Sequence, residues 1–166
     1  MNAMPNLSSI PQFVFPQIAD LCGKAPVDVA AVAHRLGLAV YVSPLPEGVS
    51  GALLKDARYD TKSGFVIFVD DSEAPVRQRF TAAHEIGHFV LHRDRIGDGV
   101  QDNYLLRSEG FSSRMEVEAN RFAADLLMPF PLINKFIAEG VRDVPALAKR
   151  FLVSEIAMAI RLGHPT

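Results

Sequence analysis

The chain is poor in cysteine: its 166 residues include one, Cys22, and no tryptophan. One cysteine excludes an intramolecular disulfide and a cysteine-based zinc site, and it suits a reducing compartment. We expect Cys22 to be a small buried hydrophobe rather than a regulatory thiol. No apolar run approaches the ~18 residues of a membrane span, and the first residues lack the basic and apolar regions of a signal peptide. The sequence therefore predicts a cytoplasmic protein.

An excess of charge of one sign is also missing. The 17 Lys and Arg residues against 19 Asp and Glu leave a formal net charge of -2. Neither a membrane partner nor direct nucleic-acid binding is therefore expected from electrostatics. The hydrophobic fraction of 49% is ordinary for a globular protein, and the length allows one compact domain or a domain with a small appendage.

Periodicity predicts an α+β fold. Residues 16–23 and 26–37 each begin with proline and end with glycine, as short helices do. Residues 38–42, 51–57 and 64–71 are typical of strands, which predicts a small, mostly antiparallel sheet of about three strands. Long helices are predicted over 73–92 and 114–128, separated by a polar connection over 93–113, and three short helices follow. A connection of that length is often functional.

The helix over 73–92 contains the stretch RFTAAHEIGHFVLH. His84 and His88 are four residues apart, so both imidazoles lie on one helix face and can reach one zinc ion. Glu85 lies about 100° round the helix, where it can act as general base toward a metal-bound water. Satisfied core histidines are the alternative. The coincidence of three specified residue types in H-E-x-x-H favours a metal site.

Two neighbours of this motif have other expected roles. His92 lies eight residues after His84, a rise of about 12 Å, which is too far for the same ion. We expect it to cap the C-terminus of the helix or to hydrogen-bond a residue that ligates the metal. Gly87 leaves room for a neighbouring helix to approach closely.

The third ligand is expected from the helix over 114–128, because catalytic zinc usually takes three protein ligands. At 100° per residue, Glu116 falls within the apolar stripe, whereas Glu118 falls on the polar side beside Asp125. A carboxylate on a buried face is costly unless it is paired or bound to metal. Glu116 is therefore the predicted ligand. The stripe itself is formed by Met115, Ala119, Phe122, Ala123, Leu126 and Leu127.

Further residues have open roles. Asn120 could hydrogen-bond a ligand histidine or Glu116. Glu118 is interpreted as a surface charge or as a charge that contacts the metal ligands without binding the metal. Tyr104 and His92 are candidates for stabilising an oxyanion, although Tyr104 also suits a plain loop aromatic. The strand Phe65–Val69 is either a sheet edge that pairs with an extended substrate or a buried strand.

The motifs RQRFTAAHEIGHFVLH and EVEANRFAADLLMP resemble those of the ImmA/IrrE metallo-endopeptidases, and GFVIFVDD and PVDVAAVAHRLGLAVYV match the family's N-terminal part. The resemblance covers residues 25–130. It implies a zincin-like metalloprotease fold, in which a small sheet lies beside the HExxH helix. It also implies one zinc ion per chain, held by His84, His88 and Glu116, with Glu85 as catalytic base. An arm and helix over 1–24 and a helical extension over 131–166, packed on the same domain, complete the expected organisation.

The family resemblance also implies a partner. Its members are thought to cleave a helix-turn-helix (XRE-like) repressor, and some relatives belong to toxin–antitoxin pairs. The expected substrate is thus a repressor or antitoxin encoded nearby. A non-proteolytic regulator or toxin–antitoxin partner using the same fold is the alternative.

A DNA-binding module is a further alternative, because residues 144–163 have a helix–turn–helix cadence. The expected core pattern of this segment is Leu147, Ala148, Phe151, Val153, Ile156 and Ile160. The second helix offers few side chains that could read base edges. Packing against the catalytic domain is therefore the favoured interpretation.

Overall fold

The computed structural model describes residues 8–103 and 113–164. Within them the helices and strands follow in the order α1 (Phe15–Ile18), η1 (Leu21–Gly23), α2 (Val29–Arg35), β1 (Val40–Ser43), β2 (Val49–Lys55), η2 (Ala57–Tyr59), β3 (Phe65–Asp70), α3 (Pro75–Leu91), β4 (Gly99–Asn103), α4 (Ser113–Leu127), α5 (Phe130–Ala138), α6 (Val144–Phe151) and α7 (Glu155–Arg161). No helix of this part of the chain has the length and apolarity that crossing a membrane requires.

The sheet is small and mixed, and the predicted α+β class is confirmed. The strand order is β1-β3-β2-β4, with β1 parallel to β3 and the other two pairings antiparallel. The sequence indicated about three strands, and the described residues form a fourth, β4. This strand lies inside the polar connection over 93–113. Its sequence GVQDN has no apolar alternation, so only the backbone pairing with β2 reveals it.

The suggestion that Phe65–Val69 is a sheet edge is wrong. Strand β3 contains these residues and is hydrogen-bonded on both sides, to β1 and to β2. Its apolar run FVIFVD is the pattern of a central strand that is buried on both faces. Within the described sheet the outer strands are β1 and β4.

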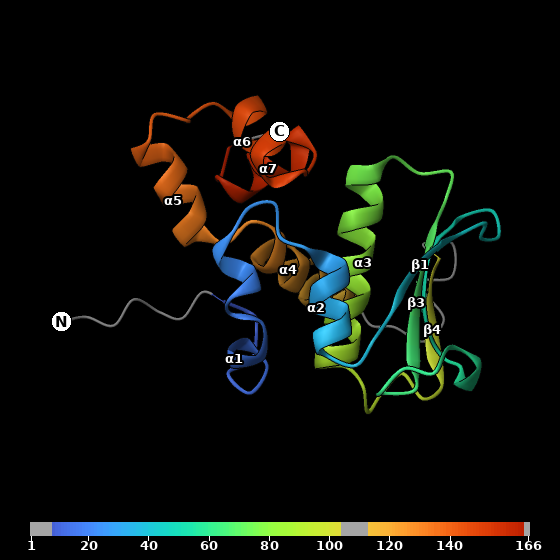
Figure 1. Ribbon diagram of the computed structural model, residues 1–166. Helices are drawn as coiled ribbons and strands as arrows, with labels where there is room; N and C mark the ends of the chain where they lie inside the picture. The colour runs from blue at the N-terminus through green and yellow to red at the C-terminus, as the bar shows by residue number, and fades with distance from the viewer. Residues whose placement is uncertain (1–7, 104–112, 165–166) are drawn as a thin grey trace.

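Helix α3 lies between the sheet and the remaining helices, as Figure 1 shows. Two glycines allow α3 to pack closely against β2 on one side and against α4 on the other. A Cβ atom at Gly51 of β2 would lie 2.4 Å from Thr81 Cγ2, and a Cβ atom at Gly87 would lie 3.1 Å from Phe122 Cβ on α4. The expectation that Gly87 admits a neighbouring helix is therefore confirmed. These contacts fix α3 between β2 and α4, where the motif residues lie.

One hydrophobic core runs through the molecule. It joins buried residues of the N-terminal segment, the sheet, α3, α4 and the C-terminal helices, among them Ile18, Leu53, Ile86, Phe122 and Phe151. The predicted apolar stripe of α4 is buried throughout. Cys22 is also buried, which raises the pKa of its thiol to about 11. That environment agrees with a packing role. The domain boundaries at residues 24 and 130 stay a prediction.

The C-terminal helices pack beside the N-terminal half of α3 (Figure 1). Arg79 of α3 donates hydrogen bonds to the carbonyls of Phe151 and Leu152, at 3.3 and 3.2 Å. Leu147, Ala148, Phe151 and Val153 are buried as expected. The inclusion of Ile156 and Ile160 in that core is wrong, because they are 67% and 63% exposed. The buried residue of α7 is Met158. The face of α7 that packs on the core is therefore the one that carries Met158, and not the one that carries Ile156 and Ile160.

Candidate metal centre

Three donor atoms from two helices converge beside the sheet. His84 and His88 lie on α3, and their Nε2 atoms are 3.0 Å apart. Glu116, in the first turn of α4, places Oε1 3.0 Å from His88 Nε2 and Oε2 3.2 Å from His84 Nε2. The four-residue spacing brings the imidazoles together, and the close packing of α3 on α4 adds the carboxylate. The structure thus brings together the three residues predicted as ligands.

The second nitrogen of His84 is held by α4. His84 Nδ1 lies 2.8 Å from Asn120 Oδ1, one turn after Glu116. An amide oxygen only accepts, so Nδ1 carries the proton and Nε2 presents a lone pair to the cluster. Of the two partners considered for Asn120, the structure shows the ligand histidine.

The second nitrogen of His88 is held through a chain of two further residues. His88 Nδ1 lies 2.9 Å from Nδ1 of His92, and His92 Nε2 lies 3.3 Å from Glu118 Oε2. The Glu118 carboxylate accepts a hydrogen bond from His92 Nε2–H, and His92 Nδ1 then accepts one from His88 Nδ1–H. His88 therefore also presents an Nε2 lone pair. His92 caps the C-terminus of α3, and Glu118 is additionally bound by Arg114 at 3.1 Å.

Burial and charge define the electrostatics of the cluster. His84 and His88 are buried, and burial lowers the pKa of His88, which favours the neutral imidazole. Burial raises the pKa of Glu116, but its interactions with the two imidazoles outweigh that effect and hold the pKa well below its usual value. The outer carboxylate also has a lowered pKa, chiefly because Glu118 is hydrogen-bonded to His92. The cluster is an ionised carboxylate facing two imidazoles, an arrangement that attracts a cation.

Glu85 lies on the sheet side of α3, and its side chain is fully buried. A Cβ atom at Gly51 would lie 3.4 Å from Glu85 Oε1, so β2 passes close to this carboxylate. Glu85 and His84 are adjacent in the helix and point about 100° apart, one toward the sheet and the other toward α4. Glu85 is not one of the three convergent donors, and its role as the base stays a prediction.

The donor set fits a divalent metal ion. Two imidazole nitrogens and one carboxylate oxygen are a ligand set of catalytic zinc sites, in which water or substrate takes the remaining position. Bonds of ~2.0–2.1 Å in a tetrahedron separate the ligand atoms by about 3.3 Å, close to the 3.0–3.2 Å found here. Because each imidazole is held by its other nitrogen, little side-chain freedom would be lost on binding. These residues can hold a metal.

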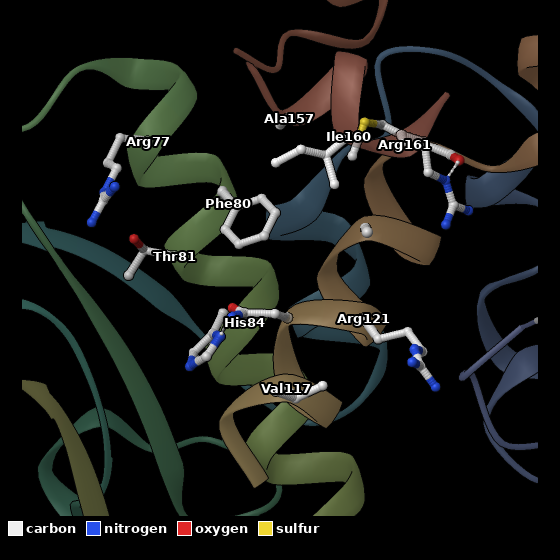
Figure 2. Close-up of a pocket in the computed structure, with 12 residues that line it drawn as sticks. Arg77, Phe80, Thr81, His84, Val117, Arg121, Ala157, Ile160 and Arg161 are labelled. Carbon is white, nitrogen blue, oxygen red and sulfur yellow. Dashed lines mark hydrogen bonds between the residues drawn. The ribbon is translucent and has the colours of Figure 1, made fainter. Parts of the chain in front are cut away.

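A pocket of about 570 Å³ adjoins the cluster at His84 and lies between α3, α4 and α7 (Figure 2). Apart from His84 and Asn120, the residues of its wall were not identified as site residues from the sequence. Arg77, Phe80 and Thr81 do precede His84 at intervals of three and four along α3, so helical spacing could have placed them on the same face. The part of the pocket that α7 contributes, which includes Ile160, could not be predicted from helical spacing, because the position of α7 depends on tertiary packing.

Other predicted residues lie away from the cluster or outside the described residues. His34 and His164, the two remaining histidines, are exposed. Tyr104 lies outside the described residues, so its role as an oxyanion donor stays a prediction. His92 contacts His88 and Glu118 rather than the convergent donor atoms.

Comparison with known sequences gives a consistent result. The model of the IrrE N-terminal-like domain, a peptidase family, matches residues 33–163. The radiation response metalloprotease IrrE of Deinococcus radiodurans is 36% identical over 164 residues, which cover 86% of this chain and 49% of that protein. IrrE of Deinococcus deserti is 33% identical over 68% of this chain and 40% of its own length. The chain spans about half the length or less of these curated relatives.

A more distant relative and a solved structure extend the comparison. An uncharacterized immunity region protein of Bacillus phage phi105 is 21% identical over 103 residues, 62% of each chain. The structure of a Mycobacterium tuberculosis transcriptional regulator superposes with a TM-score of 0.59 and covers 98% of this chain and 48% of that one, at 19% identity. That likeness concerns the fold alone. By the family match over residues 33–163, the chain belongs to the IrrE N-terminal-like domain family of metallopeptidases.

Proposed function

We propose that the protein is a zinc-dependent endopeptidase. The observation that carries the proposal is the convergence of His84, His88 and Glu116, with both imidazoles oriented by partners that leave their Nε2 lone pairs directed at one point. A zinc ion bound there would supply Lewis-acid activation of water and of the scissile carbonyl. Membership of a metallopeptidase family supports the same assignment.

The protein's own residues would perform the proton transfers. Glu85 accepts a proton from the attacking water at one of its carboxylate oxygens and later donates it to the leaving amine. Its burial between α3 and β2 excludes bulk solvent from the transfer. Asn120 and His92 keep the two imidazoles oriented.

The substrate is proposed to be a protein, and its extended segment to pair with β4, the outer strand beside β2. Strand β4 pairs with β2 at Gly51, which lies next to Glu85, so a peptide on β4 would lie two strand spacings, about 10 Å, from this part of β2. The family resemblance and the phage immunity region relative support a helix-turn-helix repressor or antitoxin as the physiological substrate. The same relative supports the alternative function, a regulator that binds such a protein without cutting it.

The test separates metal binding from catalysis. Glu85→Gln should retain about one zinc per chain and lose proteolysis of a proteome-derived peptide library, measured by metal analysis and mass spectrometry. Glu139→Gln, an exposed Glu at the end of α5, is the matched control and should cut as the wild type does. Wild-type cutting by Glu85→Gln would refute the assigned base. A zinc-loaded wild type that binds a co-expressed repressor without cutting it would favour the alternative.

A further inference from the structure

The pocket between α3, α4 and α7 has a location suited to substrate selection. His84 and Asn120, which belong to the metal centre, are also part of its wall. In Figure 2, Phe80 and Ile160 lie on one side of His84, and Val117 lies on the other. A peptide whose scissile bond lies at the metal centre would therefore place a neighbouring side chain in this pocket.

Part of the lining is apolar. Phe80, Ala124, Met128 and Ile160 come from three parts of the chain and face the same space. Ile160 is 63% exposed, although it is a large aliphatic side chain. The volume of about 570 Å³ is within the range of small-ligand pockets and exceeds what one aliphatic or aromatic side chain needs. Burial of a bulky apolar side chain here would be favourable.

The charge of the pocket has one sign. The described lining residues include three arginines and no Asp or Glu. Arg161 is neutralised by Asp125 at 2.8 Å, and Arg77 by Glu73 at 3.0 Å. Within the described residues, no carboxylate forms an ion pair with Arg121, which is exposed on α4 one position after Asn120. Arg121 therefore offers a guanidinium to an incoming carboxylate.

We propose that this pocket selects a substrate segment in which a bulky apolar residue lies next to an acidic residue. The apolar side chain occupies the space between Phe80 and Ile160, and the carboxylate binds Arg121. The proposal rests on the proposed peptidase function for its catalytic consequence. The recognition step itself does not require hydrolysis, so the two can be tested separately.

Binding is measured with blocked dipeptides and the ¹⁵N-labelled full chain, by NMR chemical-shift titration. The probes are acetyl-Phe-Glu-amide, acetyl-Phe-Lys-amide and acetyl-Ala-Glu-amide. Acetyl-Phe-Glu-amide should bind about tenfold or more tightly than the alanine peptide, because it buries an aromatic ring. It should bind about fivefold more tightly than the lysine peptide, because of one partly exposed ion pair. The shifts should centre on Phe80, Ala124 and Ile160.

Two matched pairs of variants test the assignment to this pocket. Arg121→Glu should reverse the preference for glutamate over lysine, and Arg142→Glu, an exposed arginine elsewhere, should leave it unchanged. Ile160→Ser should weaken both phenylalanine peptides about threefold or more. Ile156→Ser should not, because Ile156 is similarly exposed on α7 but is not among the residues that line the pocket. All four substitutions are at exposed positions, so the fold should be retained.

Several outcomes would overturn the proposal. Equal binding of the three peptides by the wild type would do so, as would an unchanged preference in Arg121→Glu or shifts centred elsewhere. Pocket resonances that shift on dilution of the protein alone would indicate that a second copy occupies the site instead. In the peptide-library digest, the wild type should cut beside apolar–acidic pairs, and Arg121→Glu should lose that preference. Normal peptide binding with no cutting at all would refute the proposed catalysis while leaving the recognition site standing.

Discussion

Helix α4 carries two inward-facing carboxylates near its two ends, and their surroundings differ. Glu116, in the first turn, faces the Nε2 atoms of His84 and His88 at 3.2 and 3.0 Å. Asp125, in the last turns, has Oδ1 2.8 Å from Arg161 Nη1, and their side chains are only 5% and 11% exposed. The N–H and hydroxyl of Ser9 donate to the other oxygen of Asp125.

The difference lies in the source of the positive charge. Asp125 is neutralised by a guanidinium of the same chain, which also donates from Nε to the carbonyl of Met128 and stacks on the ring of Phe130. That cluster is complete and joins the N-terminal segment, α4 and α7. Glu116 faces two imidazoles whose outward nitrogens are already held. A largely buried carboxylate that faces two imidazole lone pairs favours an added cation, so the first carboxylate is predicted to bind metal and the second to stabilise the fold.

The largest expected effect is on metal binding at the first carboxylate. Glu116→Ala should lose most of the bound zinc, because one of three protein ligands is removed. Free zinc at about a thousand times its Kd should raise the unfolding free energy of the wild type by ~4 kcal/mol and leave that of Glu116→Ala almost unchanged. Metal analysis and urea denaturation measure both. Equal zinc content in Glu116→Ala and wild type would remove Glu116 from the ligand set.

Breaking the second carboxylate should reduce stability instead. Asp125→Ala leaves Arg161 buried without its partner, which we expect to cost about 3–5 kcal/mol of unfolding free energy in urea denaturation. The control is Asp20→Ala, which removes an exposed ion pair with Arg35 and should cost far less, because solvent screens an exposed pair. The zinc content of folded Asp125→Ala should remain that of the wild type. Similar small costs for both variants would contradict the role given to the buried pair.

A smaller effect on zinc affinity is expected from His92 and Glu118, which hold the second ring nitrogen of His88. His92→Phe removes the acceptor of His88 Nδ1–H and should weaken zinc binding about 10–100-fold, measured by competition with a chelator. Glu118→Gln keeps an amide oxygen that can accept from His92 Nε2, so it should lose less affinity. An unchanged zinc affinity in His92→Phe would mean that His88 does not depend on this partner.

The smallest expected effect concerns the N-terminal contact of the second cluster. Ser9→Ala removes the hydroxyl donor to Asp125 and leaves the backbone N–H in place, so the cost should be about 1 kcal/mol. Ser8→Ala is the adjacent control, because the Ser8 hydroxyl accepts from the Ile10 N–H and makes no contact with Asp125. A loss from Ser9→Ala as large as that from Asp125→Ala would show that the serine, rather than the arginine, holds this carboxylate.

The prediction of Glu116 and the misplacement of Asp125 come from the same helical projection. The projection placed Glu116 within the apolar stripe, and the side chain is 14% exposed. It placed Asp125 on the polar side with Glu118, yet Asp125 is buried while the Glu118 side chain is 40% exposed. An angular projection describes one helix and cannot include the packing of α7 and of the N-terminal segment over the last turns of α4. Ile156 and Ile160 were misplaced for the same reason.

Local spacing was sufficient for three features of α3. The interval between His84 and His88, the exclusion of His92 from the donor atoms and the space left by Gly87 follow from the pitch of an α-helix. The tertiary structure decided the remaining features: the central position of β3, the backbone-paired strand β4, the Arg161–Asp125 ion pair and the pocket walled by α7. Each of these depends on contacts between segments distant in sequence, whose docking is determined by the whole core.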